Sequence, residues 1–357
     1  MISIRSSLIR TAIKSCPVVS LSLVLLLSFF IRPITSAAAD YPEAEITNGI
    51  VTAKMYLPDA ENGYYRSTRF DWSGAVYSLQ YAGHEFYGPW IDRIDPDIIN
   101  WEHRGDEIVS GLCSALNGPV EEFVTPLGWD DAETGGTFIK IGVGVLLKSE
   151  GRYNQYKHYD VLNPGTWTVK KAHDSVEFTQ ELSDPSSGYA YTYRKTVRIA
   201  NGKPEMEIDH SLKNTGRLAI NTSVYNHNFV RIDNQGTGPD YTVRMPFEIQ
   251  QGEGDNRGPA EISGNRIVFP RQLTGKDEIV LFIDGYDDTA KDNELIIENT
   301  KVGAGMRITG NRPLIQELLW SIRTVLTIET FVGIDIQPGD EFTWKNIIEY
   351  YTLPAGK

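Results

Sequence analysis

Polar and apolar residues alternate along several segments of this chain, and this alternation limits the possible folds more than any other feature of the sequence. In residues 191–199, positions 191, 193, 197 and 199 are apolar or aromatic, while threonine or arginine occupies the even positions. Residues 206–212 alternate in the same way. A period of two puts the apolar side chains on one face of a β-strand. His210 lies on the apolar side of its segment, where we expect a hydrogen-bonded histidine of the core.

Many further segments have strand character, and long segments with helical periodicity are scarce. Turn sequences such as Asp184-Pro185 and Asn201-Gly202 separate these segments. Many short strands joined by such turns favour an all-β fold, a large antiparallel β-sandwich, over a parallel sheet covered by helices. Besides the two segments above, the predicted strands are residues 75–81, 139–147, 166–170, 175–182, 220–232, 241–247, 279–283, 295–298, 306–309, 325–336 and 342–351.

Residues 1–39 have the layout of a secretory signal peptide. Basic residues from Arg5 to Lys14 precede an apolar stretch over 18–31, and three alanines end at Ala39. The apolar stretch is shorter than the ~20 residues that a membrane-spanning helix needs. We therefore expect cleavage near Ala39 and export to the periplasm or the cell exterior.

The remainder, residues 40–357, is expected to form one β-sandwich domain held together without a disulfide. Cys113 is the only cysteine after the first 39 residues, so no internal disulfide can form. Those 39 residues hold four basic residues and no acidic one, so without them the formal net charge of −13 becomes −17. Such a charge disfavours nucleic acids and anionic membrane surfaces as partners. With 18 Tyr, 13 Phe and 7 Trp, the chain suits a neutral, hydroxyl-rich ligand that aromatic faces can cover. The oligomeric state stays open.

Glu329 interrupts one of the most apolar strands. The predicted strand 325–336 is apolar on both faces except for threonines, Glu329 and Asp335. An unpaired buried carboxylate is costly, and the usual response is a raised pKa or a dedicated partner. A carboxylate in that state suits a general base near neutral pH. The alternative is a structural glutamate that reaches solvent or pairs with an arginine such as Arg323.

His227 is the second polar residue that does not suit the strand in which it lies. On the predicted strand 220–232, Tyr225, His227 and Phe229 share one face. Histidine is the side chain whose ordinary pKa lets it accept and donate protons near pH 7. The alternative is a structural histidine that only links neighbouring hydrogen-bond partners.

The sequence around both residues resembles the galactose mutarotase (aldose 1-epimerase) family, from about residue 70 onward. The resemblance to an exported branch of this superfamily is carried by three blocks of sequence: the strand series from Trp167 through Phe178 to Tyr193, the histidine strand Asn221-Thr-Ser-Val-Tyr-Asn-His-Asn-Phe229, and the C-terminal segment Ile328-Glu329-Thr-Phe-Val-Gly followed by Pro338-Gly339-Asp-Glu-Phe-Thr-Trp344. It implies a mutarotase-like β-sandwich and an isomerase that interconverts the α and β anomers of a free aldose.

The chemistry implied by this resemblance needs one acid and one base. The proton of the C1 hydroxyl is removed while the ring oxygen is protonated, and the ring then closes onto the other face of C1. By the resemblance, Glu329 would be the base and His227 the acid, exchanging roles on closure. No metal or cofactor is implied, and the expected partner is a monosaccharide or oligosaccharide.

Four further residues are expected to bind the substrate. His158 stands before Trp167, where the family has a histidine, although the glycines that follow the family's histidine are missing. Asp287, in Gly285-Tyr-Asp-Asp288, stands for the family's sugar-binding aspartate but lacks the histidine that follows it. Arg69 offers a planar fork of donors to sugar hydroxyls. Asn226, beside the proposed acid, is the fourth.

Two other functions stay open at this point. One is a non-catalytic carbohydrate-binding protein on the same scaffold, because a fold does not guarantee an activity. The other is a carbohydrate-active enzyme of another class, such as a lyase or a hexose-phosphate epimerase, the latter requiring a basic pocket. Glu121 and Glu122 make a poor glycosidase pair, because adjacent strand residues point to opposite faces.

Overall fold

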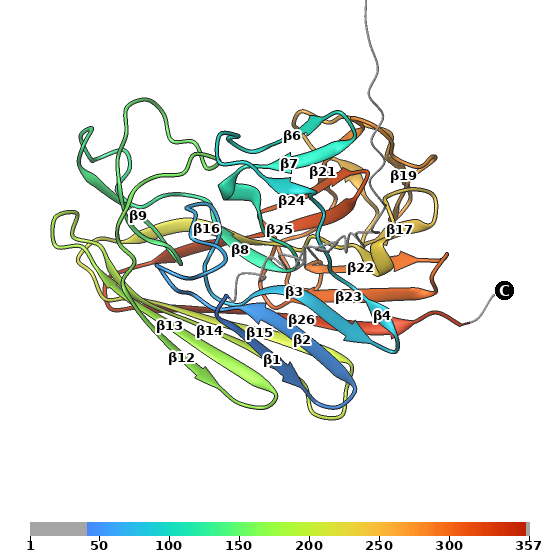
Figure 1. Ribbon diagram of the computed structural model, residues 1–357, viewed down its shortest axis with the longest axis horizontal. Helices are drawn as coiled ribbons and strands as arrows, with labels where there is room; N and C mark the ends of the chain where they lie inside the picture. The colour runs from blue at the N-terminus through green and yellow to red at the C-terminus, as the bar shows by residue number, and fades with distance from the viewer. Residues whose placement is uncertain (1–40, 355–357) are drawn as a thin grey trace, which may run out of the picture. The chain divides into compact units, whose positions relative to one another are not determined.

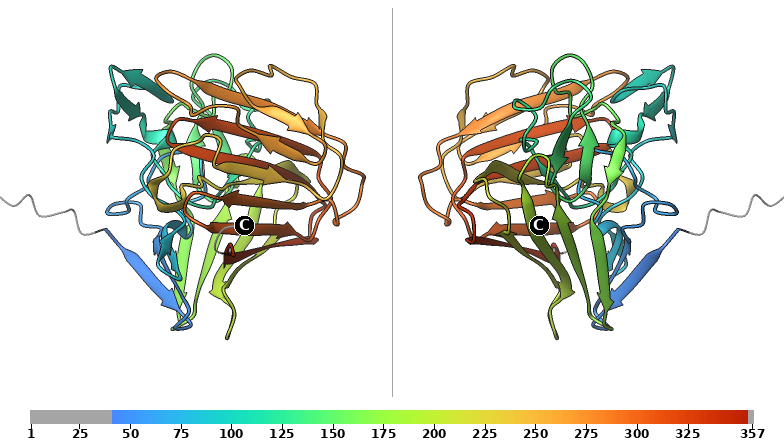
Figure 2. Two further views of the ribbon diagram at one scale, coloured as in Figure 1. Left: turned by 90° about the vertical axis from the view of Figure 1, so that its right-hand side faces the viewer. Right: turned by 90° about the vertical axis from the view of Figure 1, so that its left-hand side faces the viewer.

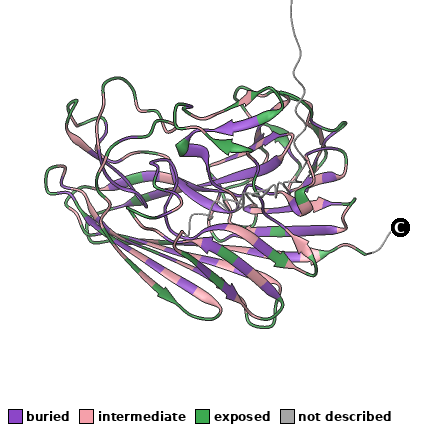
Figure 3. Ribbon diagram, in the orientation of Figure 1, coloured by how far each residue is buried: buried purple, intermediate pink, exposed green. Residues whose placement is uncertain are grey.

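The alternation in the sequence is realised as long strands with every second side chain buried. The computed structural model describes residues 41–354, so the predicted signal segment 1–39 lies outside the described residues. Strand β14 (Ala190–Ile199) buries positions 191, 193, 195, 197 and 199. Strand β15 (Glu205–Asn214) pairs with it and buries the even positions, including His210. Figure 3 shows how buried positions follow the strands.

Ten strands form the larger of two main sheets, and every neighbouring pair is antiparallel (Figure 1). Figure 2 shows the twist of this sheet between its green and its orange strands. In spatial order the strands are β12 (Thr166–Lys171), β13 (Ser175–Ser183), β14, β15, β26 (Glu341–Thr352), β23 (Ala304–Gly310), β22 (Glu294–Asn299), β17 (Tyr241–Arg244), β20 (Arg266–Val268) and β19 (Glu261–Ser263).

Six antiparallel strands form the second main sheet. One hydrophobic cluster contains Val197 and Ile348 from the first sheet together with Leu319 and Ile328 from the second, so the inner faces of the two sheets pack on each other. This confirms the all-β sandwich predicted from the sequence. In spatial order the strands are β18 (Gln250–Gln251), β21 (Glu278–Asp284), β24 (Gln316–Ile322), β25 (Val325–Ile336), β16 (Ile220–His227) and β8 (Val120–Phe123).

No helix among residues 41–354 is long and apolar enough to cross a membrane.

The remaining strands of residues 41–354 form three smaller sheets. The first small sheet comprises β1 (Glu43–Thr47), β2 (Val51–Tyr56), β3 (Ala75–Tyr81) and β4 (His84–Glu85); the second, β11 (Val161–Asn163), β10 (Gly144–Leu147) and β9 (Thr137–Lys140); the third, β5 (Arg93–Ile94), β7 (Glu107–Ser110) and β6 (Trp101–Arg104).

Two of the predicted strands are wrong in their extent. The segment 139–147 is two strands, β9 and β10, because Gly142 takes a left-handed conformation (φ 78°) in the turn between them. The segment 220–232 ends as a strand at His227, because Phe229 also has a positive φ (36°). A short 3-10 helix, η2 (Ile232–Asn234), follows. The other strand predictions agree with the structure to within a few residues.

Candidate active site

The outer face of the six-stranded sheet carries a cavity of about 500 Å³. Because side chains alternate between the two faces of a strand, Tyr225 and His227 of β16 line this cavity together with Glu329 and Phe331 of β25. β16 and β25 are neighbours in the sheet, and Tyr225 lies opposite Phe331 in their antiparallel register. Continuing that antiparallel register by two residues brings His227 opposite Glu329.

The two residues singled out in the sequence meet in this cavity. The Nε2 atom of His227 lies 3.2 Å from Oε1 of Glu329. Their side chains are only 4% and 7% exposed, so the contact is nearly closed to bulk water. Arg323, the structural partner considered for Glu329, instead donates to the backbone oxygens of Asp106 and Gly275. Glu329 therefore faces an imidazole and a cavity, not a structural arginine.

Aromatic packing holds the imidazole of His227. Phe229 stacks on it with ring centroids 3.7 Å apart and planes 12° apart, and Phe70 meets it edge-on at 5.7 Å. The positive φ of Phe229 is unfavourable for a bulky residue, and such backbone strain persists only where the surroundings enforce it. The Nδ1 atom of His227 is buried and has no hydrogen-bond partner among the described residues. Burial, and secondarily the positive charge of Arg69, hold the pKa of His227 well below its ordinary value.

Burial has the opposite effect on the carboxyl group. It raises the pKa of Glu329 to about 8, although the charge of Arg69 acts to lower it. The pair therefore carries one proton over a wide range around neutrality. Burial alone favours a neutral imidazole and a protonated carboxyl in the empty site. A carboxyl and an imidazole in contact beside a cavity, with pKa values that burial moves in opposite directions, can serve as an acid and a base.

Arg69 forms a second wall of the cavity and is fixed by a buried polar network. Its Nε donates to Oε2 of Glu122 at 2.7 Å, and its two Nη atoms donate to Ser114 Oγ (3.2 Å) and Tyr225 Oη (3.1 Å). Lys140, fully buried, lies 3.5 Å from the other oxygen of Glu122. Arginine has five N–H donors. Three are used here, so two have no hydrogen-bond partner among the described residues.

Glu121 serves a separate network on the other face of β8, as expected for the residue adjacent to Glu122. Its carboxylate contacts Nζ of Lys195 and accepts from Nδ2 of Asn226 at 3.0 Å. It also lies 2.9 Å from Nε2 of His210, the histidine that the sequence analysis assigned to the core. The adjacent glutamates thus stabilise two buried clusters and do not converge on one bond.

Three of the predicted substrate-binding residues do not reach the cavity. Asn226 lies on the opposite face of β16, bonded to Glu121, because it is one residue away from His227 on a strand. His158 lies in a separate pocket, with Nδ1 3.0 Å from Ser67 Oγ. Asp287 is exposed in a loop where its backbone N–H donates to Asp292. Of the four, only Arg69 lines the cavity.

Several aromatic and charged residues that shape the cavity do not stand out in the sequence. Trp90, Trp101 and Trp320 line it, and Trp90 stacks on Phe229 at 5.6 Å. A tryptophan fits an ordinary core position equally well, so its residue type alone carried no signal. Glu122 gives a clearer signal in the sequence, because a charged side chain inside the buried strand Val120–Phe123 needs a buried partner.

Residues 41–354 contain no group of three or more His, Cys, Asp or Glu residues placed to hold a metal ion.

No family model matches the sequence, and no curated protein matches it either. Solved structures share its fold. A candidate aldose 1-epimerase from Escherichia coli K12 aligns over 87% of this chain and 99% of its own, with a TM-score of 0.54 and 11% identity. A galactose mutarotase related enzyme from Lactobacillus acidophilus aligns over 88% and 98%, at a TM-score of 0.52 and 12% identity. A galactose mutarotase-like protein from Clostridium acetobutylicum aligns over 87% and 95%, at 0.52 and 12%. The chain thus has the galactose mutarotase-like fold.

Proposed function

We propose that the protein is an exported aldose 1-epimerase, which interconverts the α and β anomers of a neutral aldose with His227 and Glu329 as its proton-transfer pair. The observation that carries this proposal is the 3.2 Å contact between the two side chains at a cavity of about 500 Å³. The predicted signal segment supports the export to the periplasm or cell exterior. The similarity to mutarotase-like structures adds the sugar substrate.

One transferable proton is enough for this reaction. One group of the pair removes the proton of the C1 hydroxyl while the other protonates the ring oxygen, which opens the ring. After rotation about the C1–C2 bond, the two groups exchange roles and the ring closes. Because burial favours the proton on Glu329 in the empty site, Glu329 acts as the acid in the first half and His227 as the base. This order reverses the roles that the sequence analysis assigned to the two residues.

The charges around the cavity favour a neutral sugar over a sugar phosphate. Arg69 is paired with Glu122, and Arg257 at the cavity rim is paired with Glu278 at 2.8 Å. A dianionic phosphate binds most readily to cations that lack such partners. This pairing argues against a hexose-phosphate epimerase. A lyase or a non-catalytic sugar-binding protein would not accelerate mutarotation, so a measurement of that rate distinguishes both from an aldose 1-epimerase.

Polarimetry tests the proposed reaction directly. The purified mature protein is expected to accelerate the decay of optical rotation in freshly dissolved α-glucose or α-galactose, in proportion to enzyme concentration. The control is the same protein after heat denaturation. Binding of these sugars without acceleration would identify a sugar-binding protein instead, and no effect on any aldose would contradict the proposal.

The shared proton predicts an unusual pH dependence. The active pair holds one proton, so kcat/KM is expected to fall about tenfold per pH unit above about pH 8, where Glu329 loses its proton. The lower limb lies below the ordinary pKa of histidine, because burial lowers the pKa of His227. Initial rates between pH 5 and 10, corrected for the uncatalysed reaction, measure this profile. A rate constant that continues to rise beyond pH 9 would show that the pair does not act with one proton.

A further inference from the structure

The cavity extends well beyond the acid and base pair. Its floor is a row of side chains across four neighbouring strands: His227 on β16, Glu329 on β25, Leu318 on β24 and Phe282 on β21. Leu318 lies opposite both Glu329 and Phe282 in the sheet register. Three strand spacings of about 4.8 Å make this floor about 14 Å wide. That width exceeds one pyranose ring.

Two tryptophans extend the wall of the cavity from the acid and base pair. The ring of Trp320 meets the imidazole of His227 edge-on, with centroids 5.9 Å apart. Trp320 lies two residues beyond Leu318 on the same face of β24, and its Nε1 donates to Oε1 of Glu278 at 3.0 Å, which fixes the indole. Trp101 reaches the cavity from β6, with its ring centroid 5.7 Å from that of Trp320 and the planes 67° apart. Both rings are half-buried, and the pair forms an angled aromatic wall.

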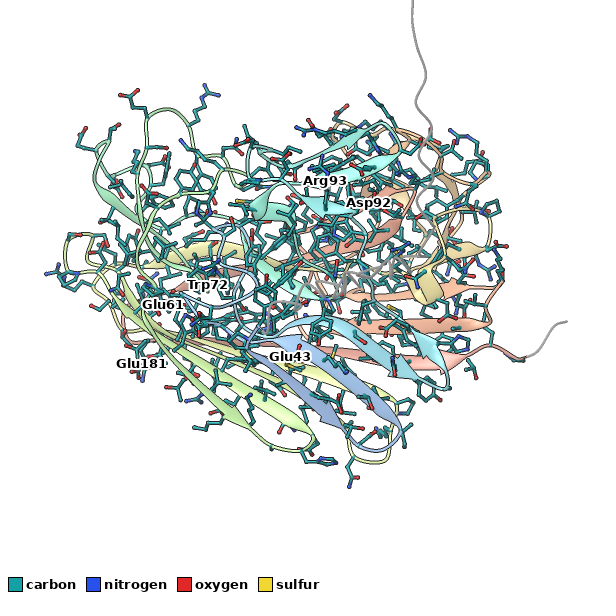
Figure 4. All side chains as sticks on the ribbon, in the orientation of Figure 1. Glu43, Glu61, Trp72, Asp92, Arg93 and Glu181 are labelled. Atoms are coloured by element: carbon teal, nitrogen blue, oxygen red, sulfur yellow. The ribbon has the colours of Figure 1, made fainter. Side chains whose placement is uncertain are left out.

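β6, the strand that carries Trp101, pairs with β7 along its whole length, with Trp101 opposite Ser110. In the segment next to it, Asp92 exchanges two hydrogen bonds with the backbone of Ile108 on β7, at 2.8 and 2.7 Å. Arg93 of β5 pairs with Glu107 at 3.1 Å (Figure 4 labels Asp92 and Arg93). This three-stranded sheet therefore presents Trp101 as part of a preformed wall.

The rim beside the two tryptophans is polar, and its cation, Arg257, is paired with two carboxylates. Arg257 donates to Glu278 at 2.8 Å and to Asp255 at 2.8 Å, and all three line the cavity. Carboxylate oxygens and guanidinium N–H groups offer acceptors and donors side by side. A neutral ligand with many hydroxyl groups can use both without adding a charge.

We propose that the cavity takes the reducing end of a neutral oligosaccharide, with the second sugar ring held against Trp101, which joins the wall through Trp320. The terminal ring lies at His227 and Glu329, an assignment that rests on the proposed function. The C–H face of the second ring covers the indole of Trp101, since this removes apolar surface from water, and its hydroxyl groups meet Asp255 and Glu278. The preferred substrate is therefore a disaccharide or longer, not a monosaccharide.

Sugar binding measured by calorimetry tests the second-ring site without depending on catalysis. The wild-type protein is titrated with glucose and with the reducing disaccharides maltose, cellobiose and lactose. At least one disaccharide is expected to bind tenfold or more tightly than glucose. Trp101→Ala is expected to reduce that ratio to about one, whereas Trp101→Phe, which keeps an aromatic face, retains most of it. Thermal unfolding of each variant checks that the protein is folded.

Each outcome decides one of the two proposals. Equal affinities for glucose and every disaccharide, no measurable binding of any of them, or a preference that survives Trp101→Ala would overturn the second-ring site. If glucose mutarotation is accelerated in that case, the epimerase proposal still stands. A disaccharide preference that depends on Trp101, without acceleration for any sugar, would support the second-ring site and reject the epimerase.

Discussion

Glu329→Gln is expected to lower the catalysed rate of mutarotation by about 10²–10⁴-fold, the contribution of a positioned proton-transfer group. Glutamine has nearly the shape of a glutamic acid but cannot release or accept the proton shared with His227. The rate is measured by polarimetry at pH 7 with saturating sugar. The matched control is Glu181→Gln on β13, an exposed carboxylate at the edge region of the other sheet (Figure 4), which should leave the rate unchanged.

A His227 variant and a double variant test whether His227 and Glu329 act together in catalysis or contribute independently to the rate. His227→Gln is expected to cause a loss of similar size, and the double variant should be little slower than either single one, because residues that act as a unit are not additive. Independent effects that multiply in the double variant would contradict a shared proton. So would a Glu329→Gln protein that is folded and retains the wild-type rate.

The largest expected effect on stability comes from Lys195→Met. The Lys195 side chain is fully buried, contacts Glu121, lies 3.8 Å from Oδ2 of Asp71 and donates to the backbone oxygen of Ser73 at 2.8 Å. Methionine fills similar space but leaves two buried carboxyl groups without this charge. Losing one partner of a buried ion pair typically costs about 3–5 kcal/mol. Urea unfolding at pH 7 measures the change in the free energy of unfolding.

The pKa values in this cluster predict how that loss depends on pH. Burial acts to raise the pKa of Glu121, but Lys195 and His210 lower it to about 2. A lowered carboxyl pKa contributes stability above its ordinary pKa, and the contribution is lost as the pH falls through about 2. The difference between wild type and Lys195→Met should therefore shrink in acid. The control is Lys170→Met, whose side chain is 72% exposed beside Glu177 and should change stability by less than about 1 kcal/mol. Equal losses in both variants would show that the buried cluster does not stabilise the fold.

The interior strands could be predicted because their pattern is local. The segment 325–336 is a strand with the predicted bounds, and Glu329 is conspicuous in it because a charge in an apolar strand is rare. The same logic identified His227. The end of its strand was missed because the positive φ of Phe229 depends on the packing of that ring against His227 and Trp90.

Three of the predicted substrate-binding residues lie away from the cavity for related reasons. His158 and Asp287 were chosen by their order along the chain, which says nothing about which loops face the same cavity. Asn226 was chosen for its closeness to His227 in sequence, although one step along a strand reverses the side chain. Trp101 and Trp320 come from different sheets and meet only in the folded protein.

By itself the sequence determined the all-β architecture and the two side chains whose chemistry does not suit their strands, because alternation and burial cost act within a few residues. Tertiary structure alone decided that His227 and Glu329 face each other, that Glu122 holds Arg69 in the same cavity, and that the cavity continues to two tryptophans. These contacts depend on strand register and on which sheet each strand enters. Both are set by the packing of residues far apart in the chain.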